Sequence, residues 1–394
     1  MMRARPKGLS ALIALLLMVL ISACGSNSDD DKNPPQSAGG IAAVEQASGF
    51  VKTAESDLLY FPNSKFSNPD SLKPMETWLG PTKAVQVPSG KSVALVSCGA
   101  PSCDDVMAQS VKLIESLGWA ATAINQGGAS TVQNLTESLS SAITLKPDAI
   151  IGIAVPTQVV GVQLTQAKAA GIFTVSLADN GATGGDGQYD AAARYANASL
   201  GQLLGYTVIA DSDGKANVLV IDDTGFPDIH AGVENFQTIL KDCSSCTVKG
   251  IPWQITDAID PTKASGIVTA ALNANPDVDT IVVPYTNGLQ AVIGAVRASG
   301  RDIEIYCKEL DQISGPALKR GDLSGVAASD FTLVAYQSVD QTIRGLAGVA
   351  PIPEEQLPIL THVFRQETVP TIDTADFQSL FDYESEYAKL WGKK

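Results

Sequence analysis

The sequence predicts an α/β protein built from two doubly wound lobes, each a parallel sheet covered by helices. Three observations lead to this prediction. Short apolar, β-branched runs alternate with stretches of helical period, and the whole alternation occurs twice along the chain. Residues 149–155 (AIIGIAV) carry no polar side chain, as expected of a central strand buried on both faces. Gly171 follows a helical stretch, where a residue tolerant of positive φ can end the helix.

The first lobe is expected to comprise residues 91–195 and a later segment, about 330–356. Its strands are predicted at 91–98, 119–125, 149–155 and 173–177. Helices are predicted at 104–117 and 131–145, and a third leads to Gly171. In the first of these helices Met107, Val111, Ile114 and Leu117 recur at helical spacing, which indicates one apolar face.

The second lobe is expected to comprise residues 196–329 and about 357–394. Strands are predicted at 217–221, 248–255, 280–283 and 303–307, with helices at 228–240, 261–273 and 288–298. A helix at 333–346, a strand at 357–364 and a helix from Thr374 follow. They are too short for a third domain, so we interpret them as return crossings between the lobes. Ahead of both lobes, residues 41–90 are expected to form a short helix, 41–57, and an irregular extension.

The first 23 residues have the pattern of a secretory signal peptide. Arg3, Arg5 and Lys7 precede an apolar run, 9–21, that is too short to span a membrane. The run ends in Ile-Ser-Ala-Cys, which resembles a bacterial lipobox, and the resemblance implies that Cys24 is lipidated. An ordinary signal peptide with an incidental cysteine is the alternative. Residues 24–40 are polar and rich in Gly, Ser and Pro, so we interpret them as a flexible tether.

The charge balance argues against a nucleic-acid partner. Lys and Arg number 27 against 42 Asp and Glu, a formal net charge of −15, whereas phosphate binding requires a basic face. No segment after the signal is long and apolar enough to cross a bilayer. We therefore expect the folded part to lie outside the cytoplasm, in the periplasm or at the cell surface.

The cysteines are consistent with an oxidising compartment. The close pairs Cys98/Cys103 and Cys243/Cys246 are predicted to form two local disulfides, which leaves Cys307 on a strand. A zinc site with four thiolates is a weaker alternative, because the pairs lie in different lobes. We predict no metal and no cofactor.

Ligands of open parallel sheets bind at the carboxyl ends of the strands, and polar and aromatic residues collect there in both predicted lobes. Amide, hydroxyl and carboxylate groups beside aromatic rings suit one small organic molecule. The candidate ligand contacts are Thr157, Asp179, Asn180, Phe226, His230, Trp253, Tyr285, Asn287, Asp311, Asp330 and Phe331. Capping of a helix is the alternative for the acidic residues and Asn287, and burial in the core is the alternative for Trp253.

The order of several short segments resembles the type I periplasmic solute-binding proteins of ABC importers, from about residue 89 to 364. The matching segments are 90–96 (GKSVALV), 168–175 (KAAGIFTV), Asp179, 195–197 (YAN), Leu310-Asp311 and 321–325 (GDLSG). The resemblance implies two lobes joined by a three-segment hinge, with 326–330 in the second segment. It also implies one ligand in the cleft, an ABC permease as partner and a monomer.

Two positions depart from the sugar-binding members of that family. They commonly have arginine after the acidic residue that ends the fourth strand, where this chain has Asn180. They also commonly have one early in the second lobe, where residues 224–236 contain none. Bidentate guanidinium contacts to sugar hydroxyls are therefore missing or replaced. We expect a ligand that is sugar-like but less polar or partly aromatic.

The sequence thus predicts a lipid-anchored solute-binding protein that delivers a small molecule to an ABC permease. A sensory binding protein that signals to a membrane receptor is the alternative. An enzyme is not expected, because the chain lacks a Gly-x-Ser-x-Gly elbow and a His-Glu-x-x-His motif and has only two histidines.

Overall fold

The computed structural model describes residues 38–56, 59–60, 73–74, 77–124, 131–179, 181–369 and 381–393. The predicted signal peptide, lipidated Cys24 and most of the tether lie outside these residues, as does Asn180. Ser37–Lys394 forms one compact unit.

The first lobe is built on a five-stranded parallel sheet of order β4-β3-β5-β6-β7. Its strands are β3 (Ser92–Ser97), β4 (Ala120–Ile124), β5 (Ala149–Ile153), β6 (Phe173–Leu177) and β7 (Ala191–Ala193). The side chains of β3 alternate between two cores, with Val93 and Leu95 in one and Ala94 and Val96 in the other. The four predicted strands are present, and β7 is an additional short one.

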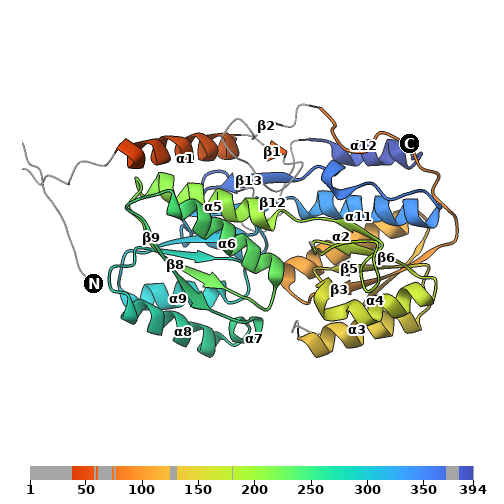
Figure 1. Ribbon diagram of the computed structural model, residues 1–394, viewed down its shortest axis with the longest axis horizontal. Helices are drawn as coiled ribbons and strands as arrows, with labels where there is room; N and C mark the ends of the chain where they lie inside the picture. Colours follow the sequence, from red (N-terminus) through yellow and green to blue (C-terminus); the bar gives the residue numbers. More distant parts are fainter. Residues whose placement is uncertain are drawn as a thin grey trace, which may run out of the picture. The chain divides into compact units, whose positions relative to one another are not determined.

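Helices cover both faces of this sheet, as Figure 1 shows. On one face lie α2 (Pro101–Ser116) and α11 (Phe331–Leu346), and on the other α3 (Val132–Thr144) and α4 (Thr157–Ala169). Leu135 and Leu139 of α3 are buried against this sheet, as the predicted helical period requires. The doubly wound arrangement predicted for the first lobe is therefore confirmed.

The second lobe contains an eight-stranded sheet of order β2-β1-β13-β12-β11-β10-β8-β9. Five strands are parallel: β8 (Asn217–Asp222), β9 (Thr247–Pro252), β10 (Thr280–Val283), β11 (Glu304–Lys308) and β12 (Gly325–Ser329). Three antiparallel strands extend one edge: β13 (Leu360–Phe364), β1 (Leu59–Tyr60) and β2 (Lys73–Pro74). The second lobe is thus a parallel sheet, as predicted, with an antiparallel edge.

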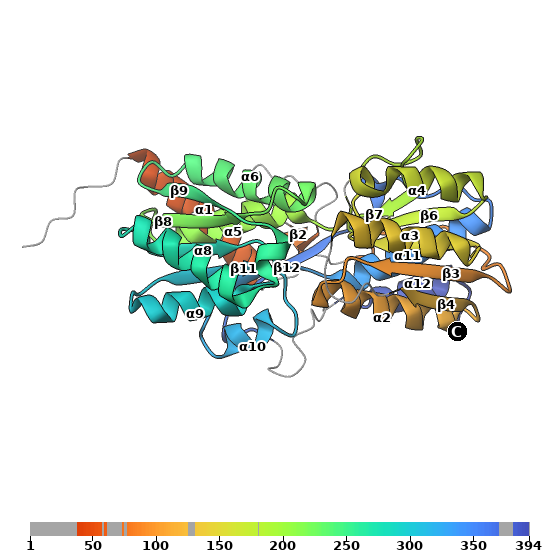
Figure 2. The same cartoon turned by 90° about the horizontal axis from the view of Figure 1, so that it is seen from below.

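Helices also cover both faces of the second sheet, as Figure 2 shows from below. The main ones are α5 (Asn197–Asp211) and α6 (Pro227–Lys241) on one face and α8 (Pro261–Ala274) and α9 (Leu289–Ser299) on the other. Shorter helices are α7 (Ile255–Ala258), α10 (Ser314–Lys319) and a 3-10 turn at Glu354–Gln356. Among the described residues, no helix is long and apolar enough to cross a membrane.

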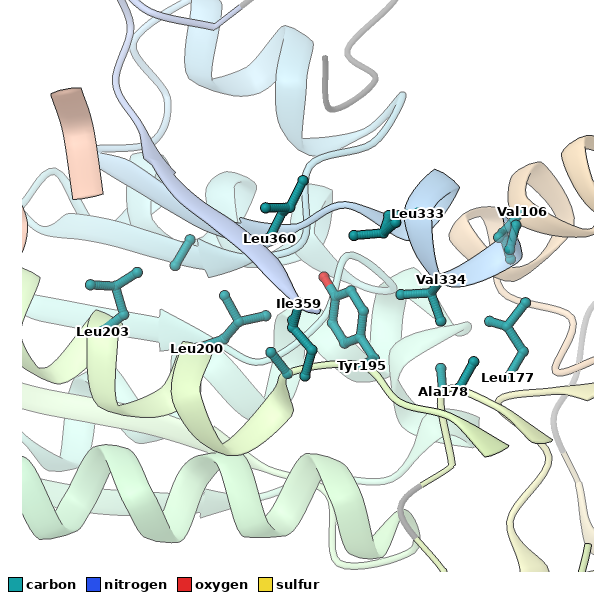
Figure 3. Close-up of a cluster of buried hydrophobic side chains, with 14 of the residues drawn as sticks. Val106, Leu177, Ala178, Tyr195, Leu200, Leu203, Leu333, Val334, Ile359 and Leu360 are labelled. Carbon is teal, nitrogen blue, oxygen red and sulfur yellow. The ribbon is translucent and has the colours of Figure 1, made fainter. Parts of the chain in front are cut away.

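Between β3 and β13, three crossings join the lobes, from β7 to α5, from β12 to α11 and from α11 to β13. The Tyr195 ring in the first crossing lies among Leu333 and Val334 of α11 and Ile359 and Leu360 at β13 (Figure 3). All five residues belong to one buried cluster that contains side chains of both lobes. The three-segment hinge implied by the family resemblance is therefore present.

The two ends of the described chain add to this hinge. The helix α1 (Ala38–Ser56) packs on α5 and β13 in the second lobe, where Phe50 stacks on Tyr206. Downstream, the N–H of Val85 donates a hydrogen bond to the carbonyl of Leu390 in the helix α12 (Tyr383–Leu390). Because α12 packs on α11 of the first lobe, this part of the extension also lies in the first lobe.

The C-terminal helix α12 is placed in the first lobe, whereas the sequence suggested the second. The Trp391 ring stacks on Tyr336 of α11, and its Nε1 donates to Asp340 at 2.9 Å. The strand β13 and Val369 do belong to the second lobe. The predicted assignment of 357–394 to that lobe is therefore wrong only for the C-terminal helix. Helical period shows that a helix has a buried face, and it does not show which lobe that face packs on.

The cysteines pair as predicted. Cys98 is bonded to Cys103 and Cys243 to Cys246, and Cys307 on β11 is buried as a free thiol. Within the described part of the chain, no group of three or more His, Cys, Asp or Glu residues is arranged to hold a metal ion.

Candidate ligand-binding site

A cavity that is partly open to solvent lies where strands of the two sheets end, and it holds about 710 Å³ of space including the open part. Residues after β3, β5 and β6 line it from the first lobe, and residues after β8, β10 and β11 line it from the second. The first and second crossings contribute Tyr195, Asn197 and Phe331. This is the position at which open parallel sheets bind ligands.

Five of the predicted ligand contacts line this cavity. They come from both lobes and from the hinge: Asp179, Phe226, Tyr285, Asn287 and Phe331. These residues are far apart in the sequence, and the fold brings them to one space.

Thr157 does not line the cavity, but it holds Asp179, which does. Both its main-chain N–H, at 3.1 Å, and its hydroxyl donate to Oδ2 of Asp179. The carboxylate therefore faces the N-terminus of α4, where the partial positive charge of the helix favours an anion. Asp179 is only 4% exposed, so these hydrogen bonds satisfy one oxygen of a nearly buried carboxyl group beside the cavity.

The hydroxyl of Tyr285, a residue of the cavity wall, is held by the buried carboxyl group of Asp223. Its hydroxyl donates to Oδ2 of Asp223 at 2.9 Å, and the Gly225 N–H donates to Oδ1. Burial raises the pKa of Tyr285 above its ordinary value, as does the nearby charge of Asp223. Burial likewise raises the pKa of Asp223, against the hydrogen bond from Tyr285. The ring is thereby fixed in orientation at the cavity wall.

An ion pair that the sequence did not reveal stands in the same cavity. Nζ of Lys308 lies 3.2 Å from Oε1 of Glu309, donates to Oδ1 of Asn197 and sits 5.4 Å from the centre of the Tyr195 ring. Lys308 and Glu309 are 3% and 7% exposed. Burial raises the pKa of Glu309, and the charge of Lys308 opposes that rise. The two charges offset each other inside the site.

The remaining wall is mostly apolar and aromatic. Tyr195 and Phe331 are stacked with ring centroids 4.1 Å apart. Ala100, Ala154, Pro156, Ala178, Pro227, Ile229 and Ile255 complete this wall with the Cys98–Cys103 disulfide. Such a surface favours a ligand with an apolar or aromatic face.

The backbone is strained at three strand ends that line the cavity. Ala154, Ala178 and Glu309 directly follow β5, β6 and β11, and each has positive φ, at 48°, 71° and 79°. This conformation costs a residue other than glycine about 1–2 kcal/mol. Strain of this kind tends to be kept at functional sites, so its repetition here supports a binding role for the cavity.

Two predicted contacts cap helices instead of lining the larger cavity. Asp311 accepts hydrogen bonds from the N–H groups of Ile313 and Ser314 and from the Thr286 hydroxyl at 2.6 Å. Asp330 accepts from the N–H groups at the start of α11. Asp311 does line a second, smaller cavity of about 390 Å³, which shares Ser102 and Phe331 with the first.

Two further candidates also lie away from the larger cavity. Trp253 is 2% exposed and belongs to the core of the second lobe. His230 on α6 pairs through Nδ1 with Asp222 at 2.8 Å. That hydrogen bond raises the pKa of His230. Asn180 lies outside the described residues.

The residues that the sequence reading missed fall just beyond predicted strand ends or in the crossings. Lys308 and Glu309 follow the predicted strand 303–307, which in the structure ends one residue later, at Lys308. In the sequence, Tyr195 and Asn197 stand out only as part of the segment 195–197 that resembles the family. Lys308 and Glu309 lie between the predicted strand and the candidate Asp311, so their position at a strand end was a signal for the ion pair, whereas the crossings carry no such signal.

A ligand cavity between two doubly wound lobes joined by three crossings defines a class of binding proteins with the type I periplasmic binding fold. The chain belongs to the family described as periplasmic binding protein domain, whose model matches residues 103–348. No curated protein matches the sequence.

Solved structures with this fold include sugar-binding members of ABC transporters. An ABC sugar transporter subunit from Rhodobacter sphaeroides is 22% identical over 70% of this chain and 98% of its own, with a TM-score of 0.59. A glucose-galactose binding protein from Geobacillus stearothermophilus is 18% identical over 72% and 100%, with a TM-score of 0.63. A solute-binding protein from Agrobacterium vitis, bound with α-D-tagatopyranose, is 19% identical over 72% and 98%, with a TM-score of 0.62.

Proposed function

We propose that this protein is an extracytoplasmic solute-binding protein, anchored by lipid at Cys24, that passes one small organic molecule to an ABC-type permease. The observation that carries the proposal is the partly open cavity that strand ends of both lobes and residues of the hinge line together. A cavity shared by two hinged lobes can bury a ligand when the lobes close.

The charges in the cavity favour a neutral ligand. Asp179 accepts hydrogen bonds from Thr157 at the start of α4, and Lys308 is paired with Glu309 inside the site. Asp228, a further carboxylate that lines the cavity, also has an interaction partner, so these charges are already engaged. A charged ligand would have to lose its hydration without gaining an unpaired opposite charge, which is costly. No arginine is among the residues that line the described cavity. Together with the apolar wall, this supports a neutral, sugar-sized molecule with an apolar or aromatic face.

The similar structures support a sugar-type ligand. They are a sugar transporter subunit, a glucose-galactose binding protein and a solute-binding protein bound with α-D-tagatopyranose. We extend this chemistry to the present chain in general form only, as a polyhydroxylated or sugar-like compound.

The first experiment is a thermal-shift screen followed by calorimetric titration. D-Galactose, D-galacturonate and D-galactosamine form a matched neutral, anionic and cationic set, and aryl galactosides add an apolar face. A ligand present at 100 times its Kd stabilises the folded state by about 2.7 kcal/mol, so a true ligand raises the melting temperature clearly. We expect neutral compounds, aryl glycosides above all, to give the largest shifts. Selective binding of the charged members would contradict the proposed ligand class.

Recovery of the ligand tests binding without turnover. The bound compound should be released unchanged on denaturation, as judged by mass spectrometry, and its conversion to another product would identify an enzyme. In the producing cell, removal of this protein should abolish uptake of the compound. Unchanged uptake with loss of a transcriptional response would favour the sensory alternative.

A further inference from the structure

We propose that the first turn of α2 is a latch that holds the two lobes together beside the ligand, and that the Cys98–Cys103 disulfide positions it. This inference rests on the proposed function for its biological meaning, since a latch serves closure over a bound molecule.

The latch consists of two polar contacts between the lobes. The Ser102 hydroxyl of α2 lies 3.4 Å from Oε2 of Glu309, at the end of β11. One turn further along α2, Asp105 accepts hydrogen bonds from Nε2 of Gln312, at 3.0 Å and 3.2 Å to its two oxygens. Residues three apart on a helix face the same side, so both contacts come from one face of α2.

The latch stands where the two cavities meet. Ser102 lines both the larger and the smaller cavity, whereas Glu309 lines the larger one and Asp105 the smaller one. The contacts therefore form part of the wall of the ligand site. Their loss would open that wall toward the smaller cavity.

The disulfide ties the latch to the first sheet. Cys98 directly follows β3, and Cys103 lies in the first turn of α2, so the bond joins the strand to the helix on either side of Ser102. A second tie lies beside it, because the Ser97 hydroxyl donates to Asp104 at 2.6 Å. The start of α2 has no side-chain cap to hold it. The disulfide thus supplies much of the local order that fixes the position of Ser102 and Asp105.

The other half of the latch is held equally firmly in the second lobe. Glu309 is paired with Lys308 at 3.2 Å, and its carbonyl accepts from the Ser314 hydroxyl at 2.8 Å. Its N–H donates to Ala327 at 3.0 Å, which continues the sheet one residue beyond β11. Its left-handed φ sets the direction in which the side chain leaves the backbone, and the contact with Lys308 holds the carboxylate. Both sides of the contact are therefore preorganised for each other.

The second disulfide provides a matched control. Cys243–Cys246 also closes a short loop, between the end of α6 and β9, and neither cysteine lines either cavity. Removal of either disulfide should lower stability by a similar mechanism, since short loops restrict the unfolded chain comparably. Only the removal of Cys98–Cys103 should affect contacts between the lobes.

The test is hydrogen exchange followed by mass spectrometry on the full-length, ligand-free chain. We expect C98S/C103S to accelerate exchange at least tenfold in peptides covering residues 309–314, across the cleft from the changed cysteines. C243S/C246S should leave those peptides unchanged. S102A/D105A keeps both disulfides and should also accelerate exchange at 309–314. This variant keeps the proposal testable if a cysteine variant fails to fold.

Two results would overturn the proposal. If S102A/D105A exchanges like the wild type at 309–314, the contacts do not hold the lobes together. If C98S/C103S speeds exchange only within residues 97–104, the disulfide has a local role and does not position the latch. No ligand enters the measurement, so its failure is distinguishable from failure of the proposed solute-binding function.

Discussion

Thr157 and Asp179 form one unit at the edge of the ligand cavity, because both the main-chain N–H and the hydroxyl of Thr157 donate to the same carboxylate oxygen. Of the two residues only Asp179 lines the cavity. The hydrogen bonds from Thr157 therefore fix the position of a carboxylate that borders the cavity.

Asp179→Ala should weaken ligand binding by about tenfold or more, since a hydrogen bond to a charged group contributes about 1.5–3 kcal/mol. Calorimetry with the compound identified by the screen measures the effect. Thr157→Val keeps the N–H bond to Asp179 and should lose less affinity. Asp277→Ala changes an exposed carboxylate and serves as a control. Equal affinities for wild type and Asp179→Ala would place the site elsewhere.

Asp311→Ala should reduce stability more than affinity. The substitution leaves the Thr286 hydroxyl and the N–H groups of Ile313 and Ser314 without their acceptor at a position that is 3% exposed. Each unsatisfied buried group costs about 1–3 kcal/mol, so a loss of at least about 2 kcal/mol is expected in urea unfolding. Asp311→Asn retains one oxygen and should lose less. A large loss of affinity at unchanged stability would instead make Asp311 a ligand contact.

Asp330→Asn should flatten the dependence of stability on pH. Burial raises the pKa of Asp330 to about 7, despite the N–H groups of Thr332 and Leu333 that stabilise its charge. Between pH 4 and 7 the folded state keeps a proton that the unfolded chain has released. Stability contributed by Asp330 therefore falls as pH rises through this window, by about 1.4 kcal/mol per pH unit.

The asparagine cannot titrate but can still cap α11, so Asp330→Asn should gain stability relative to the wild type between pH 4.5 and 7. Unfolding in urea at several pH values gives the difference curve. Asp277→Asn is the control and should run parallel to the wild type. A parallel curve for Asp330→Asn would show that its carboxyl does not titrate in this range.

Gly201→Ala should destabilise the protein although alanine favours helices. A Cβ at Gly201 in α5 would lie 1.9 Å from the carbonyl oxygen of Gly232 in α6, so the two helices would have to separate. Overpacking of this kind costs about 1–3 kcal/mol. Gly294→Ala in α9 is the matched control, because its Cβ meets nothing within 4 Å. It should gain about 0.5–1 kcal/mol. Thermal unfolding of both variants is the measurement, and a gain for both would contradict the close α5–α6 contact.

Cys24→Ala should release the protein from membranes. The basic start, the short apolar run and the small residues before Cys24 predict that this cysteine carries the lipid. Fractionation of cells that produce wild type and variant is the measurement. A Cys24→Ala protein that remains in the membrane fraction would argue for another anchor.

The sequence by itself determined the type and approximate bounds of two kinds of element: helices with one buried face and strands at the centre of a sheet. The runs at β3, β5, β6 and β8 and the periods of α3 and α8 predicted two strand–helix lobes close to their observed bounds. The residues at the predicted strand ends also included Asp179, Tyr285 and Asn287 of the cavity. These signals are local, because a pattern of apolar residues records which face of an element is removed from water.

Only the tertiary structure decided the rest. The helix α5 lies between α1, α6 and the sheet, and it buries Leu200, Leu203 and Val208 around much of its circumference. A helix buried on most sides has no apolar stripe, so periodicity missed it. The pairing of Lys308 with Asn197 and the docking of Trp391 on Asp340 join segments far apart in the chain. Such partners leave no local pattern, since the contacts exist only after the lobes and the chain ends have packed.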